Sequence, residues 1–175
     1  MKKAILAFLF MSAITTQLVY AQTSSTKVPF FDLDISGSSG NYNGRTYSEV
    51  HLGVNMNFTE WLTWRNAAFK RFGSGGTEDD ITGLDSSLRL VLSKPFSGGA
   101  FRFFLGPGYR WADPSEKNAG FAEGGLGLSF GRFSVSAGAK YLKYDKIQYN
   151  SAGAETKRDD LSYFLTLSGG AGLSF

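Results

Sequence analysis

The chain has 175 residues, a formal net charge of +3 and no cysteine. The absence of cysteine excludes a disulfide framework and a thiolate site, and the small net charge gives no reason to expect nucleic-acid binding. Glycine is abundant at 22 residues, proline is scarce at four, and aromatic residues make up 15% of the chain. This composition predicts many strands and few helices.

The first residues have the pattern of a secretory signal peptide. Lys2 and Lys3 precede an apolar run, and Val19-Tyr20-Ala21 offers small residues at the two positions that a signal peptidase reads. We therefore expect residues 1–21 to be cleaved and residues 22–175 to form a single domain. A transmembrane anchor is the alternative, but the apolar core is short and polar residues follow it. The rest of the chain has no apolar run of the roughly 18 residues that a spanning helix needs.

After this leader, apolar and polar residues alternate with a period of two in eight segments, which predicts eight strands with one apolar and one polar face. The predicted strands are residues 29–37, 47–58, 61–72, 82–93, 100–111, 120–130, 132–144 and 161–175. The predicted short connections are residues 59–60, 94–99 and 131, and the long, polar ones are residues 38–46, 73–81, 112–119 and 145–160. Long and short connections alternate, as in an up-and-down barrel whose tight turns all lie at one end.

The two faces of these strands differ in size as well as in polarity. In the second strand, Val50 and Leu52 lie on one face, whereas Glu49 and His51 lie on the other. Alternation alone does not say which face is inside. The small Gly and Ser side chains of the polar face suit the narrow interior of an eight-stranded barrel. We therefore predict an all-β fold, an eight-stranded antiparallel transmembrane β-barrel with the polar face inside.

The outward face then carries bulky apolar residues, with aromatic side chains near the strand ends. Two aromatic belts flanking an aliphatic band match the two interfaces of a bilayer. The expected belts are Phe58, Trp61, Phe101, Phe130, Phe133 and Phe175 at the short-turn end and Phe72, Tyr109, Trp111, Tyr141 and Tyr163 at the long-loop end. The third strand fits least well, because Asn66 falls on its apolar face.

With these features the chain resembles the small eight-stranded outer-membrane β-barrels, of the OmpX kind and the OmpA transmembrane-domain kind. The resemblance rests on the leader, the alternating strands, the unequal connections and the ending Leu173-Ser174-Phe175, and it covers essentially the whole chain after residue 21. It implies a monomer in the outer membrane of a Gram-negative bacterium, in contact with outer-membrane lipids and lipopolysaccharide. In that family a terminal aromatic residue such as Phe175 resembles the signal read by the barrel-assembly machinery.

The predicted interior carries charges of both signs, and these have to pair because an unpaired buried charge is very costly. We expect an ion-pair network that plugs the lumen, since eight strands leave an interior just wide enough for side chains. A narrow, porin-like path for ions or small solutes is the alternative. The expected network consists of the acids Asp32, Asp34, Glu49, Asp85 and Glu123, the bases Arg65, Arg71, Arg89, Arg102, Arg110 and Lys140, and His51.

His51 is the single histidine and shares a strand face with Glu49. Such a pair can orient a general base, but hydrolysis also needs a nucleophile within hydrogen-bond reach, for which Ser48 and Ser87 are the candidates. Small barrels that deacylate lipid A carry a His-x-Ser motif, whereas this chain has His51-Leu52-Gly53. We therefore expect His51 to belong to the charge network and the chain to have no enzymatic activity.

No motif predicts a metal or a cofactor. Asp32-x-Asp34 offers too few oxygens for calcium, and no helix follows the glycine runs, as phosphate binding would require. The segment 140–146 places lysines beside tyrosines near the outer rim, where they either bind lipopolysaccharide phosphates or snorkel at the interface. The loop at 147–160 carries both signs of charge and is a candidate for contact with a surface ligand.

The predicted function is thus a structural or surface-interaction role in the outer membrane, with the lumen plugged by ion pairs. The alternatives are a narrow small-solute pore and a lipid A-modifying enzyme.

Overall fold

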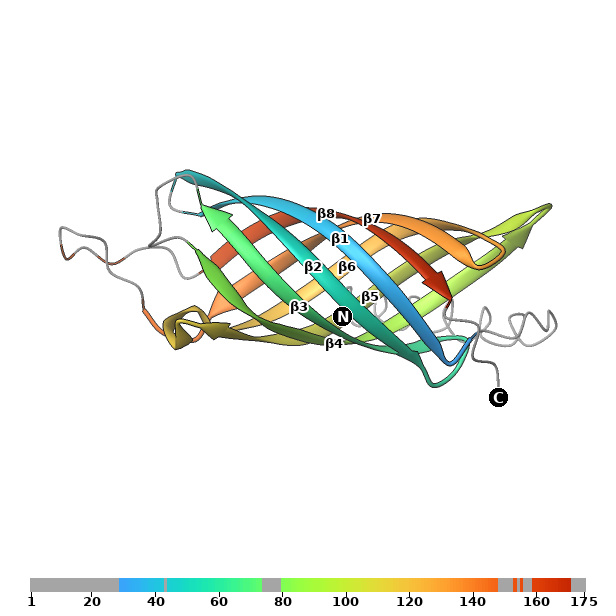
Figure 1. The fold of residues 1–175 in the computed structure, drawn as a ribbon, viewed down its shortest axis with the longest axis horizontal. Helices are drawn as coiled ribbons and strands as arrows, with labels where there is room; N and C mark the ends of the chain where they lie inside the picture. Colours follow the sequence, from blue (N-terminus) through green and yellow to red (C-terminus); the bar gives the residue numbers. More distant parts are fainter. Residues whose placement is uncertain are drawn as a thin grey trace, which may run out of the picture.

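The computed structural model describes residues 29–42, 44–73, 80–147, 153, 155 and 159–170. They form a closed barrel of eight antiparallel strands in chain order, in which β8 pairs with β1 (Figure 1). The strands are β1 (Phe31–Tyr42), β2 (Arg45–Asn57), β3 (Leu62–Gly73), β4 (Ile81–Phe96), β5 (Gly99–Asp113), β6 (Ala119–Phe130), β7 (Phe133–Tyr144) and β8 (Asp159–Gly170). The predicted fold class is therefore confirmed. None of the helices in the described ranges is long and apolar enough to cross a membrane.

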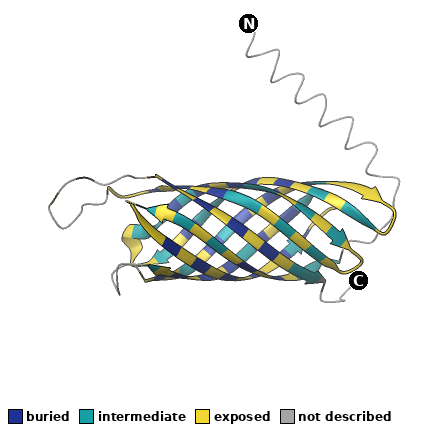
Figure 2. Ribbon diagram, turned by 90° about the horizontal axis from the view of Figure 1, so that it is seen from above, coloured by how far each residue is buried: buried dark blue, intermediate teal, exposed yellow. Residues whose placement is uncertain are grey.

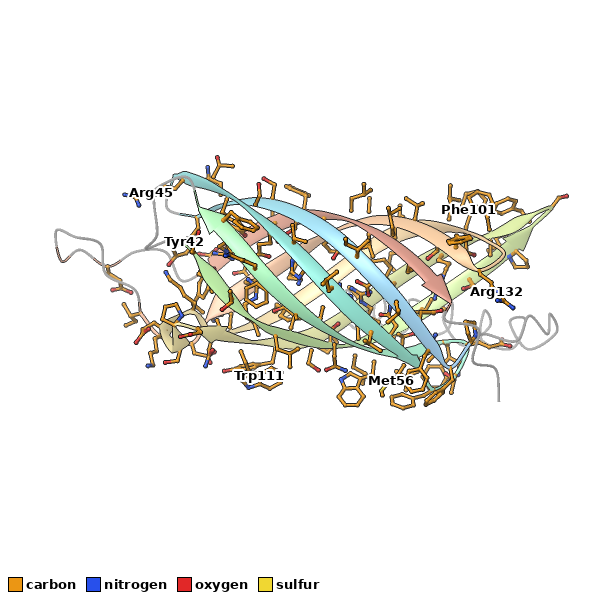
Figure 3. The ribbon with its side chains drawn as sticks, in the orientation of Figure 1. Tyr42, Arg45, Met56, Phe101, Trp111 and Arg132 are labelled. Carbon is orange, nitrogen blue, oxygen red and sulfur yellow. The ribbon has the colours of Figure 1, made fainter. Side chains whose placement is uncertain are left out.

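The two ends of the barrel differ in their connections. The short connections 58–61, 97–98 and 131–132 lie at one end, which we call the turn end. Tyr42 and Arg45 lie at the opposite end, which we call the loop end, and Figure 3 shows them far from Phe101 and Arg132. At the loop end, β5 is joined to β6 through a short 3₁₀ helix, Ser115–Lys117.

The first predicted long loop, residues 38–46, is wrong. β1 and β2 continue to the pair Tyr42↔Arg45, so that only residues 43 and 44 connect them. Gly44 has φ of 77°, a left-handed conformation that glycine adopts without a steric penalty. The Ser, Gly and Asn residues of this segment have the composition of a loop, but pairing with β2 outweighs that local preference. Long and short connections therefore do not alternate strictly.

The β4–β5 hairpin is longer than predicted and projects beyond the other turns (Figure 1, green and yellow-green). Its turn is confined to Ser97 and Gly98, because pairing continues to Phe96↔Gly99. The pairing of β3 with β4 begins only at Leu62↔Leu90, so the end of β4 pairs on one side. Lys94 and Pro95 lie in this segment. The charge of the lysine and the missing N–H of the proline both discourage another strand from pairing with this edge.

The outward surface of the barrel is apolar, and the inward surface carries the polar and charged residues. Less exposed and more exposed residues alternate along most of each strand, which gives the chequered pattern of Figure 2. Outward side chains such as Leu52, Leu126 and Phe133 are exposed by 63%, 66% and 73%. Aromatic side chains are exposed at both ends, where the sequence predicted two belts: Phe58, Trp61, Phe101, Phe130 and Phe133 at the turn end and Phe72, Trp111, Tyr141 and Tyr163 at the loop end.

Several sequence predictions fall on parts of the chain outside the described residues. The leader, residues 1–21, is one of them, and most of the predicted loops 73–81 and 147–160, the latter the candidate for contact with a surface ligand, lies outside as well. So does the end of the last strand, because β8 is described from Asp159 to Gly170 and the predicted assembly signal at Phe175 lies beyond it.

The interior also holds large aromatic side chains, which the sequence argument did not place there. Phe104 on β5 and Phe164 on β8 both point inward, and their ring centroids are 6.1 Å apart. In register, Phe104 lies beside Gly125, and Phe164 lies beside Gly138. A Cβ atom on either glycine would lie 2.6 Å from the Cζ atom of the neighbouring ring. These glycines thus make room for the rings to reach across the lumen.

Candidate functional site

The main candidate site is the charged middle of the lumen, with Arg110 of β5 at its centre. Its guanidinium donates to Asp85 through Nε at 2.7 Å and Nη2 at 2.8 Å, and to Glu49 through Nη1 at 2.7 Å. Each carboxylate has a second base, since Arg71 Nε lies 2.7 Å from Glu49 Oε1 and Lys140 Nζ lies 2.7 Å from Asp85 Oδ2. Five strands therefore contribute to one cluster of charge-assisted hydrogen bonds, the strong class of such bonds.

Two further pairs lie closer to the turn end. Arg65 donates to both carboxylate oxygens of Asp34, through Nε at 2.9 Å and Nη2 at 2.6 Å. Arg89 donates through Nε to Glu123 Oε1 at 2.8 Å, and the hydroxyl of Ser87 donates to the same oxygen at 2.5 Å. All of these carboxylates are buried, so that each is compensated by a base in contact with it.

Aromatic rings cover four of the cations, and these rings were missed by the sequence argument. Arg110 lies 3.8 Å from the ring centroid of Phe69, and Arg71 lies 3.7 Å from that of Tyr47. The other two contacts are Arg89 over Phe104 at 4.7 Å and Lys140 over Phe121 at 4.6 Å. The sequence did contain a signal for these rings. Each ring lies two residues from an inward charge on its own strand, and residues with an even spacing share one face of a strand.

Asp160 also belongs to the lumen, although the sequence argument assigned it to the last loop. It lies on β8 and is buried. Its Oδ2 accepts hydrogen bonds from the hydroxyls of Tyr47 at 2.6 Å and Tyr144 at 3.3 Å, and lies 3.6 Å from Arg71 Nη2. Because β8 begins two residues earlier than predicted, Asp160 closes the loop end of the network.

His51 has hydrogen-bonding partners on β1 and β2 and a carboxylate of β4 nearby. Its Nε2 is 3.1 Å from Glu49 Oε2 and 3.5 Å from the hydroxyl of Ser38, and its Nδ1 is 3.7 Å from Asp85 Oδ2. The two serines proposed from the sequence are elsewhere. Ser48 is exposed on the outer surface, and Ser87 is bound to Glu123.

Ser38 was missed because it fell in the predicted loop. In the structure it pairs in register with Glu49, which brings its hydroxyl to the His51 side of the lumen. A cavity of about 10 Å³ lies beside these groups, which is roughly the space of one water molecule.

Asp32 and Arg102 are placed apart from the charged middle. Both line a second cavity of about 50 Å³ at the turn end of the lumen. Asp32 accepts a hydrogen bond from Asn57 Nδ2 at 2.8 Å. Within the described ranges, no carboxylate lies within 4.0 Å of the Arg102 guanidinium. An apolar layer of Val91, Phe104 and Phe164 borders this cavity.

The predicted rim segment, residues 140–146, is divided between the two faces. Lys140 is buried and points to Asp85, so its assignment to the outer rim is wrong. Lys143 is exposed on the outer surface. In the part of the chain that the structure describes, no group of three or more histidine and carboxylate side chains is arranged to hold a metal ion.

Neither a protein-family model nor a curated protein matches the chain. Among solved structures, the chain is similar to "the outer membrane enzyme PagL", with a TM-score of 0.52 and 18% sequence identity, over 77% of this chain and 97% of that chain.

This similarity corrects one expectation and leaves another open. The expectation that the chain has no enzymatic activity is wrong as an inference from this architecture, because a barrel of the same fold is an enzyme. The finer resemblance to the OmpX and OmpA barrels gains no support from it. At 18% identity the similarity shows the fold alone. The chain thus has the fold of a small eight-stranded outer-membrane barrel.

Proposed function

We propose that this chain is a protein of the bacterial outer membrane, exported with residues 1–21 as its signal peptide, in which the barrel is a closed structural element. Its outward apolar surface with aromatic side chains at both ends supports this location. In this proposal the loop end contacts the cell exterior, and the lumen carries neither ions nor solutes.

The observation that carries the proposal is the balance of charge in the lumen. The inward carboxylates in the described strands are Asp32, Asp34, Glu49, Asp85, Glu123 and Asp160, and the inward cations are Arg65, Arg71, Arg89, Arg102, Arg110 and Lys140. The numbers of opposite charges are equal, and all of these groups except Asp32 and Arg102 are joined in ion pairs with contacts as short as 2.6 Å, so that the described lumen has no net charge to select a permeating ion. An ion entering the network has to displace a base from a buried carboxylate, which is strongly unfavourable.

A permeation assay tests this proposal against the pore alternative. Liposomes that contain the folded barrel are diluted into an isotonic solution of a small sugar, and swelling is followed by light scattering. We expect the same swelling rate as in protein-free liposomes. A faster rate that falls as the sugar becomes larger would establish a pore and exclude the closed lumen.

We further propose that outward lysines at the loop end bind the phosphates of lipopolysaccharide. Lys70 and Lys143 are exposed there, and Lys70 lies 5.3 Å from the ring centroid of Phe72. Cationic side chains beside interfacial rings are placed at the depth of lipid headgroups. Replacing both lysines by glutamate should weaken binding to lipopolysaccharide micelles, whereas Lys94→Glu at the turn end should not. Equal binding by both variants would contradict the proposal.

A second candidate function is ester hydrolysis at Ser38 and His51. The observation in its favour is the order of the groups, with Ser38 Oγ 3.5 Å from His51 Nε2 and Asp85 Oδ2 3.7 Å from His51 Nδ1. A serine, a histidine and a carboxylate in this order are the elements of an activated nucleophile. Against it, Glu49 is nearer than Ser38 to Nε2, at 3.1 Å, and the adjoining cavity of about 10 Å³ has no room for an acyl chain.

Incubation with lipid A and with short-chain p-nitrophenyl esters tests this second candidate. Hydrolysis that is lost in both Ser38→Ala and His51→Ala would establish it. Hydrolysis retained in both variants would place any catalysis elsewhere on the barrel, and the absence of hydrolysis by the unaltered protein would exclude this function for these substrates.

A further inference from the structure

The turn-end cavity differs in chemistry from the rest of the lumen. It has a volume of about 50 Å³, and all eight strands contribute to its lining. The charged middle of the lumen consists of ion pairs. This cavity contains a guanidinium without such a partner among the described residues and a wall of hydroxyl groups, and Asp32, Asp34 and Arg89 also line it.

The guanidinium belongs to Arg102 of β5. Each of the other inward arginines has a carboxylate oxygen within 4.0 Å: Arg65, Arg71, Arg89 and Arg110. For Arg102, the described residues supply neither a hydrogen bond nor an ion pair. Arg102 lies two residues nearer to the turn end than Phe104, which forms an apolar layer with Val91 and Phe164. Asp34, the carboxylate of the network that also lines this cavity, is already bound by Arg65 at 2.6 Å.

Two carboxylates line the cavity, Asp32 and Asp34, and neither lies within 4.0 Å of the Arg102 guanidinium; Asp34 is paired with Arg65. Asp32 accepts a hydrogen bond from Asn57 Nδ2 at 2.8 Å, and the same amide nitrogen donates to the carbonyl oxygen of Pro29 at 2.8 Å. Asp32 is thereby held against β2 rather than against β5. Arg102 is half-buried, and a guanidinium with five N–H donors and no protein acceptor takes its acceptors from solution.

The hydroxyl wall lies across β7 and β8. Ser136 pairs in register with Thr166, and Ser134 pairs with Ser168. The row that contains Arg102 runs from β5 through Gly127 of β6 to Ser136 and then to Thr166. Because Gly127 has no side chain, the space between the guanidinium and the hydroxyl groups is open. A Cβ atom at that position would lie 2.8 Å from the Cβ atom of Ser136.

We infer that this cavity is a binding site for a small oxyanion with the chemistry of a phosphate group, held by the guanidinium of Arg102 and by the hydroxyls of Ser136 and Thr166. The planar guanidinium donates two parallel hydrogen bonds to phosphate or carboxylate oxygens. One water needs roughly 10–15 Å³, so a cavity of about 50 Å³ accommodates an ion with the size of inorganic phosphate. The inference does not depend on whether the lumen conducts or on catalysis at His51.

Titration of the folded barrel with inorganic phosphate tests the inference. The protein is held in zwitterionic detergent at low ionic strength, and binding is followed by amide chemical shifts and by calorimetry. We expect saturable binding with shifts concentrated at the turn end. Arg102→Gln should weaken it roughly tenfold or more, because the charge-assisted hydrogen bonds are lost. Arg132→Gln, which removes an exposed arginine at the same end, is the matched control and should leave the affinity unchanged.

The variant Asp32→Asn supplies a second test, because it should change the phosphate affinity in the opposite direction. Removing the negative charge of Asp32 from the cavity should strengthen phosphate binding, and a weakened or unchanged affinity would overturn the inference. The absence of saturable binding to the unaltered protein, or its persistence in Arg102→Gln, would also overturn it. If Arg102→Gln does not fold, as judged by heat-modifiable gel mobility, the Asp32→Asn result decides.

A parallel titration with dihexanoyl phosphatidic acid separates the two sources of a phosphate group. We expect free phosphate to bind more tightly, because the cavity has no room for acyl chains. Binding of the lipid alone would reject a site for free phosphate and would assign the cavity to a headgroup.

Discussion

Arg110 lies at the centre of the charged middle of the lumen. It is 1% exposed, joins Glu49 to Asp85, and lies over the ring of Phe69. Because both carboxylates are buried, its loss would leave two negative charges with weaker compensation. Breaking a buried ion pair from one side typically destabilises a protein by about 3–5 kcal/mol.

We therefore predict that Arg110→Ala lowers the free energy of unfolding by about 3–5 kcal/mol. The measurement is urea-induced unfolding of the barrel in lipid vesicles, followed by tryptophan fluorescence. Arg132→Ala, at an exposed turn position, should change it by less than about 0.5 kcal/mol. Similar losses for the two variants would show that the network contributes little to stability.

At the residue scale, the sequence was sufficient to place charges on the inward face but not to pair them. The period of two puts Glu49 and Arg110 on the same face of their strands, yet their contact depends on how strands that are distant in the chain are staggered around the barrel. The inward rings of Phe69 and Phe104 were missed because side-chain size was used to choose the inner face. The glycines beside such rings, Gly125 next to Phe104, are what make the large side chains fit.

At the scale of the strand, the pattern of faces makes a direct prediction about the bilayer. Leu52 lies near the middle of β2 and is 63% exposed on the outer surface. We predict that Leu52→Arg costs about 2–4 kcal/mol, as for an arginine on the lipid face near the midplane. Thr82, exposed near the loop end of β4, is the control, and Thr82→Arg should cost at most about 1 kcal/mol. Unfolding titrations that give equal costs would mean that this surface does not face lipid.

The glycines of β6 allow a matched pair of substitutions. A Cβ atom at Gly125 would lie 2.5 Å from the carbonyl oxygen of Ala137, whereas nothing lies within 4 Å of one at Gly120. We predict that Gly125→Ala lowers the free energy of unfolding by about 1–3 kcal/mol through overpacking, and that Gly120→Ala leaves it almost unchanged. The same unfolding assay measures both, and equal effects would contradict the proposed packing of Phe104.

The strands also show where sequence patterns fail. All eight could be predicted, because a period of two is a property of each segment alone. Their ends could not be predicted equally well. Residues 38–42 consist mostly of turn-forming types, yet they extend β1 because β2 continues opposite them. Asp160 was taken for a loop residue because charges are common in loops, but its hydrogen bonds to tyrosine hydroxyls place it in the lumen.

At the scale of the whole molecule, closure and charge balance act together. Pairing of β8 with β1 removes both sheet edges, as a membrane requires. Inside, the charged middle lies between two buried apolar clusters. One consists of Ala119, Phe121, Leu142 and Tyr144, and the other is the layer of Val91, Phe104 and Phe164. The fold does not decide the activity, since a barrel of similar fold is an enzyme.

Single-channel recording in planar bilayers tests the closed lumen most directly. The barrel is refolded, its folding is verified by heat-modifiable gel mobility, and current is recorded under an applied voltage at neutral pH. The account predicts no steady conductance steps from the unaltered protein. Reproducible steps whose size changes in Arg89→Glu, at the junction of the two lumen cavities, would show that ions pass through the network and would contradict it.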